Sequence, residues 1–266
     1  MARVVRARPR RRRWANIREV GRERLQELRA AVYDRDGAKV VAVLGAEVPV
    51  EVLQLVGDGL GTAIEQKVPG AVTLADRCLV KLHERGWAGD DELAAELEVA
   101  LGRRLPTPSL EALPVDLEEL SALLESGTGE RGGVVDRVSG DVWPAPAMDY
   151  AEETEEEPPD FDDGDRWLYV GPEGSGEGYR DMEDFIAGIS DRVRADQLSI
   201  VIDGRGAFRR FKDTIARWPD ELERWYRFSD ERCRGRAREW LAASGYRAGS
   251  PQPKPPSATA TGTEVP

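Results

Sequence analysis

The sequence contains very few of the side chains that most often carry catalytic or metal-binding chemistry. His83 is its one histidine, and its two cysteines, Cys78 and Cys233, stand far apart and outside any CxxC pair. A histidine-based catalytic triad and a multi-histidine metal site are therefore excluded. The cysteine usage fits a reducing compartment rather than a disulfide-rich fold. We expect all three side chains to have structural roles.

Long apolar runs are missing too. No segment approaches the ~20 apolar residues of a membrane-spanning helix. The arginine-rich start lacks the apolar stretch that follows the basic residues of a secretory signal peptide. Arginine (33) far outnumbers lysine (5), as a GC-rich bacterial genome produces. We therefore expect a soluble protein of the bacterial cytoplasm.

Charge is distributed unevenly along the chain. The net charge is -12, yet ten arginines lie within the first 25 residues, and ten acids lie within residues 149–165. Runs of one sign repel themselves and stay solvated. We expect a disordered basic arm over residues 1–14, a disordered acidic insert over 145–165 and a disordered tail over 247–266.

The first hundred residues show helical periodicity with frequent glycine boundaries. Apolar residues at helical spacing, separated by Gly45, Gly57, Gly86 and Gly102, predict a series of short helices. These lie near 16–36, 38–45, 48–57, 59–67, 71–85 and 90–101. We therefore predict an all-α bundle over 15–104, followed by a linker over 105–114.

The remainder mixes helices with a few strands and forms a second predicted domain over 115–246. The expected elements are a helix at 115–126, a hairpin at 132–143 around Ser139-Gly140, a strand at 167–170 and helices at 178–189, 204–218 and 220–244. Residues 196–203 fit either a strand or a helix, and we choose the helix. The predicted class is mainly α, with a helical bundle and an α+β domain that has a small sheet and four to five helices.

The helix over 204–218 separates apolar from charged residues. Phe208, Phe211, Ile215 and Trp218 follow one helical stripe, which predicts a core face. Arg209, Arg210 and Lys212 take the opposite face. We expect the long final helix to cover the apolar stripe as a lid.

Two hypotheses explain the charged face. In the first, Arg209 and Arg210 pair with Glu183 and Asp184 of the neighbouring helix and stabilise the fold. In the second, Arg209, Arg210 and Lys212 bind nucleic-acid phosphates while Trp225 stacks on bases. The acidic pI of about 4.8 favours the first hypothesis.

Two other features of the sequence, a glycine-rich loop and the many carboxylates, do not match a known binding or catalytic pattern. Gly171, Gly174, Gly176 and Gly178 follow a strand, but this loop has neither GxGxxG spacing nor the Lys-Ser/Thr of a phosphate loop. Glu173 and Glu177 would also repel a phosphate. The spacing of the many carboxylates selects no catalytic pair. We expect no catalytic residue, no metal and no cofactor.

Residues 115–246 resemble a known bacterial family. The motifs are MEDF at 182–185, GRGAFRRFK at 204–212, ERWYRFSDER at 223–232 and REWL at 238–241. In this order, with the RVSGDVW turn before them, they are similar to uncharacterised protein family zero-one-five-eight. The resemblance implies no activity and no catalytic residue.

The N-terminal half is similar to a second group. Its short helices, the LVKLHERGW ending of one helix and the DDELAAELEVAL helix resemble the effector-associated, death-like adaptor domains of bacterial conflict systems. Those domains pair with copies of themselves, so the resemblance implies a protein partner for the N-terminal domain.

These observations lead to one expectation and one alternative. We expect a non-enzymatic interaction or adaptor protein that binds a protein partner through its N-terminal domain and does not bind membranes. The alternative is a nucleic-acid-binding module that uses the Arg209, Arg210 and Lys212 face together with the basic arm. Because phosphate contacts weaken steeply with salt, salt dependence distinguishes the two.

Overall fold

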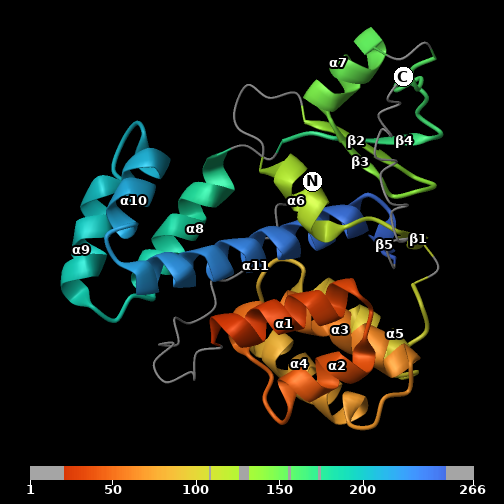
Figure 1. Ribbon diagram of the computed structural model, residues 1–266, viewed down its shortest axis with the longest axis horizontal. Coiled ribbons are helices and arrows are strands. Elements are labelled where there is room, and N and C mark those ends of the chain that lie inside the picture. The colour runs from red at the N-terminus through yellow and green to blue at the C-terminus, as the bar shows by residue number, and fades with distance from the viewer. Residues whose placement is uncertain (1–20, 108, 126–131, 155–156, 173–174, 250–266) are drawn as a thin grey trace, which may run out of the picture.

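The computed structural model describes residues 21–107, 109–125, 132–154, 157–172 and 175–249 (Figure 1). The predicted class is confirmed, since helices dominate and the strands are few and short. The expected basic arm and most of the expected tail lie outside the described residues. We refer to residues 21–104 as the N-terminal unit and to residues 111–249 as the C-terminal unit, because separate clusters of buried apolar residues lie in each.

The N-terminal unit is an all-α bundle. Its elements are α1 (Arg22–Tyr33), α2 (Gly37–Leu44), the 3₁₀ turn η1 (Val50–Val52), α3 (Leu53–Glu65), α4 (Ala71–Arg85) and α5 (Asp90–Ala100). Asp36 caps α2 by accepting a hydrogen bond from the Lys39 N–H. The core gathers around α3, where Leu53, Val56 and Leu60 are fully buried.

One expected helix boundary is wrong. Gly57 does not end a helix, because α3 continues from Leu53 to Glu65. A Cβ on Gly57 would lie 2.5 Å from the Leu93 side chain, and one on Gly59 would lie 2.9 Å from Val32 and Val40. These glycines let α3 approach α1, α2 and α5 closely, so they serve packing rather than helix termination.

The C-terminal unit contains the strands and a second group of helices. In chain order its elements are β1 (Glu111–Leu113), α6 (Leu117–Leu124), β2 (Gly133–Asp136), β3 (Val142–Pro144), α7 (Ala145–Thr154), β4 (Trp167–Val170), α8 (Ser175–Ala187), α9 (Arg192–Val201), α10 (Ala207–Ile215), α11 (Pro219–Ala243) and β5 (Tyr246–Ala248). The helical choice for 196–203 is confirmed as far as Val201, where α9 ends.

The expected hairpin is confirmed and forms the centre of a small sheet. The strand order is β3-β2-β4, and both pairings are antiparallel. Asp136 holds the turn, because its carboxylate accepts hydrogen bonds from the Val138 N–H at 2.8 Å and from the Arg166 guanidinium at 2.9 Å.

A second sheet forms where we expected a linker and a tail. β1 pairs with β5 in parallel, so that Glu111 lies opposite Tyr246 and Leu113 lies opposite Ala248. Three-residue strands carry almost no alternation signal. The pair exists because the end of α11 returns the chain to the segment that leaves the N-terminal unit.

The expected disordered insert over 145–165 is also wrong in large part. Ala145–Thr154 forms α7, which buries Ala145 and Ala151 against the sheet. The ring of Phe161 then packs at 5.5 Å from Trp143 and at 5.0 Å from Trp167. Alanines and one aromatic side chain supply the apolar contacts, while most of the acidic side chains stay exposed on the outer surface.

The stripe on α10 is buried in part. Phe211 and Ile215 are buried, but Phe208 is 38% exposed and does not belong to the core. Its ring lies against Gly178 of α8, at the edge of the contact. The prediction for Phe208 is wrong because α10 turns Phe211 and Ile215 into the core and leaves Phe208, in its first turn, at the edge of the packing against α8.

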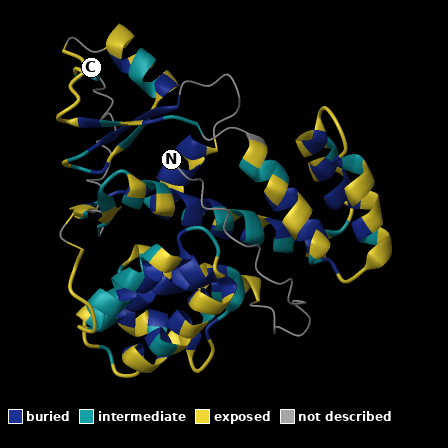
Figure 2. Ribbon diagram, turned by 180° about the vertical axis from the view of Figure 1, so that it is seen from behind, coloured by how far each residue is buried: buried dark blue, intermediate teal, exposed yellow. Residues whose placement is uncertain are grey.

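The last helix, α11, is a central element rather than a lid. It contacts η1, α3 and α5 of the N-terminal unit and α6, α8, α10 and β5 of the C-terminal unit. Figure 1 shows α11 running between the bundle and the sheet, with α8, α9 and α10 at its N-terminal end. Figure 2 shows that its residues are largely buried or half-buried.

Candidate functional site

The contact between the two units is built from buried charges. Glu231 of α11 is 4% exposed, and its Oε1 accepts hydrogen bonds from Arg85 Nη1 at 2.7 Å and from the Gln54 N–H at 2.6 Å. Burial raises the pKa of Glu231, and the positive charge of Arg85 opposes that rise. Glu231 thereby ties α11 to the end of α4 and the start of α3.

Arg85 also holds the turn between α4 and α5. Its Nε and Nη2 donate to the two carboxylate oxygens of Asp90 at 2.9 and 2.6 Å, the bidentate arrangement that arginine forms best. Burial alone would lower the pKa of Arg85, but Glu231 and Asp90 raise it above its usual value. The guanidinium lies 4.4 Å from the centre of the Trp87 ring.

Arg238 of α11 makes a second set of contacts between the two units. Its side chain is 1% exposed and donates to Gln54 Oε1 at 2.9 Å and to the carboxylates of Glu96 and Asp58. Burial would lower the pKa of Arg238, but Asp58 and Glu96 raise it. Asp58 accepts from Arg234 as well, at 3.1 Å.

Between these charge clusters the two backbones touch directly. A Cβ on Gly235 would lie 2.2 Å from the carbonyl oxygen of Ala88, and one on Gly89 would lie 2.2 Å from that of Gly235. Only glycine fits at both positions, and Gly89 also has a φ of 78°. We call this contact, with Arg85, Asp90, Glu231 and Arg238, the α11 lock.

Buried ion pairs contribute little net stability, because removing two charges from water costs nearly as much as their attraction returns. Losing one partner, however, leaves an uncompensated buried charge. The buried charges of the α11 lock are all paired in one relative placement of the two units, so other placements are disfavoured.

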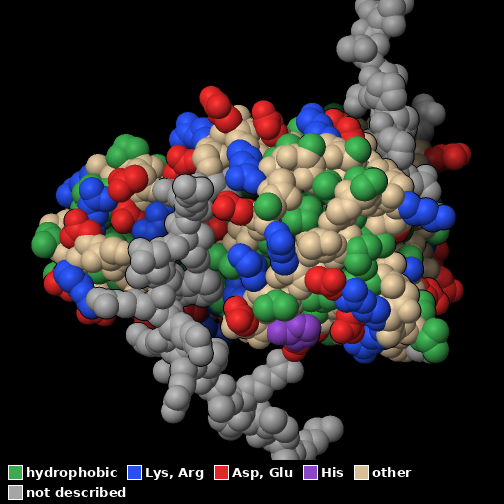
Figure 3. All heavy atoms as spheres, turned by 90° about the horizontal axis from the view of Figure 1, so that it is seen from below, with side chains coloured by type: hydrophobic (Ala, Val, Ile, Leu, Met, Phe, Trp, Pro, Cys, Tyr) green, Lys and Arg blue, Asp and Glu red, His purple; other side chains and the backbone are tan. Residues whose placement is uncertain are grey.

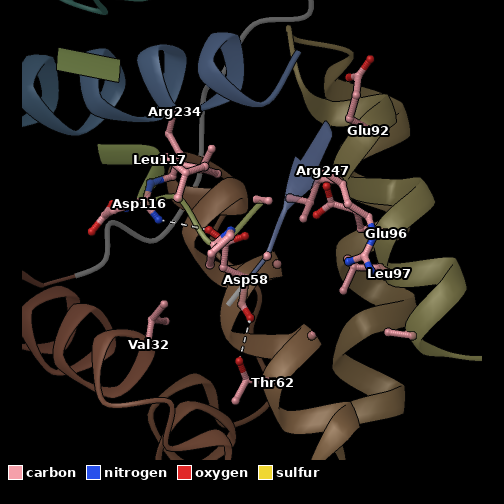
Figure 4. Close-up of a pocket in the computed structure, with 18 of the residues that line it drawn as sticks. Val32, Asp58, Thr62, Glu92, Glu96, Leu97, Asp116, Leu117, Arg234 and Arg247 are labelled. Atoms are coloured by element: carbon pink, nitrogen blue, oxygen red, sulfur yellow. Dashed lines mark hydrogen bonds and ion pairs between the residues drawn. The ribbon is translucent and has the colours of Figure 1, made fainter. Parts of the chain in front are cut away.

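A groove opens beside the α11 lock. It has a volume of about 1100 Å³ and is lined by α1, α3 and α5 on one side and by the start of α6 and β5 on the other. Figure 4 shows Asp58 and Thr62 of α3, Glu92 and Glu96 of α5, and Arg234 and Arg247 around it. We call it the interunit groove.

The interunit groove is predominantly acidic. Ten of the described residues that line it are Asp or Glu, and five are Arg. Several of the acids already have partners, since Asp58 and Glu96 accept from Arg238. Burial raises the pKa of Glu96, and Arg238 opposes the rise. A ligand with positive charge would fit this lining better than an anion.

The candidate residues on α10 do not form the expected network. Arg210 donates to the carbonyl oxygens of Val201 at 2.8 Å and Asp203 at 2.7 Å, so it holds the turn before α10. Arg209 is 90% exposed along its side chain and lies 3.9 Å from Asp213 on the same helix. Lys212 is exposed.

Glu183 and Asp184 also differ from expectation. Asp184 lies 3.6 Å from Arg232 of α11 rather than beside Arg209 or Arg210. Glu183 is exposed on the face of α8 that is turned toward α9. The predicted pairing fails because α8 packs on α9 and α11, so its acidic residues do not meet the charged face of α10.

Trp225 belongs to the core and not to a binding surface. It is 6% exposed, and its ring centre lies 4.7 Å from that of Phe211 in an edge-to-face contact. Base stacking on Trp225 is therefore excluded by its burial.

The sequence reasoning missed the residues of the α11 lock. Because arginine and acidic residues are rarely fully buried, their charge predicts exposed positions for these side chains. One signal was available: Gly235 interrupts an otherwise helical pattern, and an isolated glycine in a helix often marks a close packing contact.

The remaining candidates have structural positions. Cys78 and Cys233 are buried, as predicted. His83 is exposed, and its Nδ1 lies 2.8 Å from the Leu79 carbonyl oxygen. On the face in Figure 3 the histidine lies among interspersed acidic and basic side chains. The loop over 171–178 lies partly outside the described residues.

The described part of the chain offers neither a metal-binding cluster nor a membrane-spanning helix. It contains no group of three or more His, Cys, Asp or Glu side chains placed to hold a metal ion. None of its helices combines the length and the apolar character needed to cross a bilayer.

Fold and site together define a mainly α, two-unit protein in which a helical bundle is docked on a unit with a small antiparallel sheet. Residues 112–258 match the model of Uncharacterised protein family (UPF0158), and the chain belongs to that family. The resemblance of the C-terminal motifs is thus confirmed.

A curated relative supports the same assignment. The UPF0158 protein PA5073 of Pseudomonas aeruginosa is 27% identical over 135 residues, which cover 48% of this chain and 82% of the relative. No solved structure matches the chain.

Proposed function

We propose that this chain is a non-enzymatic interaction protein of the bacterial cytoplasm that binds a protein partner in the interunit groove. The observation that carries the proposal is the groove itself, a space of about 1100 Å³ whose walls come from both units. The α11 lock supports it, because fixing the two walls relative to each other preorganises the groove.

The partner class follows from the charge of the groove. With ten acidic residues and five arginines along its walls, it favours a basic polypeptide segment and repels nucleic-acid phosphates. The likeness of the N-terminal unit to death-like adaptor domains supports a role in a bacterial conflict or signalling system.

Affinity capture from the native cell tests the proposal, with the full chain as bait and with nuclease present. The informative variant carries Glu92→Lys and Glu119→Lys, one on each wall of the groove. The matched control carries Glu152→Lys and Glu153→Lys, which make the same charge change on the exposed face of α7. We expect the captured protein to be lost with the groove variant and retained with the control. Equal capture by both would refute the proposal.

A second candidate is nucleic-acid binding through α10. Arg209 is 90% exposed along its side chain and Lys212 is exposed, so both are accessible to phosphates, whereas Arg210 is engaged by the turn carbonyls. Polarisation titrations of labelled mixed RNA at two salt concentrations test this role. It predicts tight binding that weakens steeply with salt and is lost in Arg209→Ala with Lys212→Ala.

A further inference from the structure

A shallow groove on the C-terminal unit combines apolar and acidic side chains. It lies between α8 and α9, has a volume of about 640 Å³ and is lined by Tyr179, Glu183, Ile186, Ala187, Ser199, Ile200, Ile202 and Asp203. We call it the α8–α9 groove. It shares no residue with the interunit groove.

Apolar side chains form the floor and one wall of the α8–α9 groove. Ile186 and Ile202 are nearly fully buried beneath it, and Tyr179 is half-buried. Ile200 on the wall is 74% exposed. An isoleucine this exposed beside apolar neighbours leaves a surface whose burial by a partner would be favourable.

Two carboxylates flank this apolar surface from different elements. Glu183 comes from the middle of α8, and Asp203 follows the end of α9. Within the part of the chain that the structure describes, neither carboxylate has a hydrogen-bond or ion-pair partner. The nearby Arg210 directs its donors to backbone carbonyls instead.

The residues of α8 that line the groove recur at helical spacing along one side of the helix. Tyr179, Glu183, Ile186 and Ala187 are spaced at i, i+4, i+7 and i+8, so they line one side of α8 along about two turns. Figure 1 shows α8, α9 and α10 grouped at one end of α11, away from the helical bundle. A partner helix can therefore approach without meeting the N-terminal unit.

We propose that the α8–α9 groove binds an amphipathic helix of a partner protein, with apolar anchors against Ile200 and Tyr179 and with Lys or Arg side chains toward Glu183 and Asp203. Charge complementarity selects this occupant, because the two unpaired acids disfavour an acidic helix. The inference rests on the proposed interaction role and adds a second surface to it.

A designed peptide tests the groove directly with the full chain. The probe is a fluorescein-labelled peptide of about 15 residues, long enough to form a helix, with leucine on one face and lysine on the other. A second peptide carries glutamate in place of lysine. Fluorescence anisotropy at ~150 mM salt, where long-range attraction is largely screened, measures both affinities.

We expect saturable binding of the lysine peptide and none of the glutamate peptide. Ile200→Asp should weaken binding by about tenfold or more, as loss of a central apolar anchor does. Glu183→Gln with Asp203→Asn should weaken it by about threefold and reduce its salt dependence. The substituted residues are the exposed Ile200 and two polar residues, Glu183 and Asp203. Thermal melting should confirm that each variant stays folded.

Matched controls lie on the same helix. Val193 is 66% exposed and Asp196 is exposed, and neither lines the α8–α9 groove. Val193→Asp and Asp196→Asn should therefore leave the affinity unchanged. No saturable binding, or an equal effect of Val193→Asp and Ile200→Asp, would overturn the proposal.

Two further outcomes separate this inference from its alternatives. Self-association in sedimentation experiments that Ile200→Asp abolishes would identify a second copy as the occupant and overturn the proposal. The Glu92→Lys and Glu119→Lys variant should still bind the peptide normally, because its changes lie in the interunit groove. Loss of captured partner in that variant with normal peptide binding distinguishes the two surfaces.

Discussion

At the scale of single residues, burial separates side chains that the sequence treats alike. Phe208 and Phe211 belong to the same helical stripe, yet Phe208 is 38% exposed and Phe211 is 1% exposed. Phe211→Ala should lower the free energy of unfolding by about 3–5 kcal/mol, because it leaves a cavity against Trp225. Phe208→Ala, with the same change in helix propensity, should cost only about 1 kcal/mol. Chemical denaturation measures both, and equal losses would contradict the observed phase of α10.

Two adjacent acids on α11 give a similar contrast for charge. Glu231 pairs with Arg85 in the buried lock, whereas Asp230 pairs with Arg29 at the surface and is 57% exposed. Glu231→Ala should cost about 3–5 kcal/mol, since it leaves the Arg85 charge buried with one partner fewer. Asp230→Ala should cost about 0–1 kcal/mol. A denaturation experiment that finds the two costs equal would show that the lock is solvated.

The cysteines provide a chemical test of burial. Desolvation raises the pKa of the Cys78 thiol to about 12, and burial raises the pKa of Cys233 as well. The thiolate is the reactive form, so both thiols should react very slowly with Ellman's reagent in the native protein near pH 8. Both should react rapidly in concentrated guanidinium chloride. Rapid native modification of either thiol would contradict its buried position.

At the scale of elements, the hairpin depends on one carboxylate. Burial alone would raise the pKa of Asp136, but hydrogen bonds from the Val138 and Ser139 N–H groups and from Arg166 lower it overall. A carboxylate with a lowered folded-state pKa stabilises the protein above its unfolded pKa of about 3.9, and this contribution is lost as pH falls through the folded value.

The free energy of unfolding should therefore fall on acidification below about pH 4, and Asp136→Asn should reduce that fall. Asp220→Asn is the control, because Asp220 also has a lowered pKa, from its hydrogen bond with Arg194, but lies at the surface. Its effect on the acid dependence should be smaller, since exposed pairs contribute little. Urea denaturation across the pH range measures both, and identical profiles for the two variants would contradict the role of Asp136.

At the scale of the whole molecule, the contact of the two units can be tested by adding one methyl group. Glycine in a helix interior usually costs stability, so Gly61→Ala in α3, where a Cβ would meet nothing within 4 Å, should stabilise the protein by about 0.5–1 kcal/mol. Gly235→Ala should instead destabilise it by about 1–3 kcal/mol, because the new Cβ would lie 2.2 Å from the Ala88 carbonyl oxygen. Calorimetry distinguishes these signs, and stabilisation by Gly235→Ala would mean that the units do not touch there.

The sequence by itself determined the mainly α class, most helix positions, the hairpin around Ser139-Gly140 and the family of the C-terminal unit. Local signals are sufficient for these features. Helical periodicity predicts α4 and α11, a short turn between β-branched runs predicts β2 and β3, and ordered motifs identify the family.

Only the tertiary structure decided which charges are buried and where the units meet. Arg85, Glu231 and Arg238 are of the same residue types as many exposed side chains. Their burial depends on partners as many as 184 positions away in the chain, as for Arg238 and Gln54. β1 and β5 form because α11 brings their segments together, and the sequence of neither strand records the other. Long-range contacts of this kind leave no periodic trace in a single sequence, so the α11 lock and both grooves become visible only once the chain is folded.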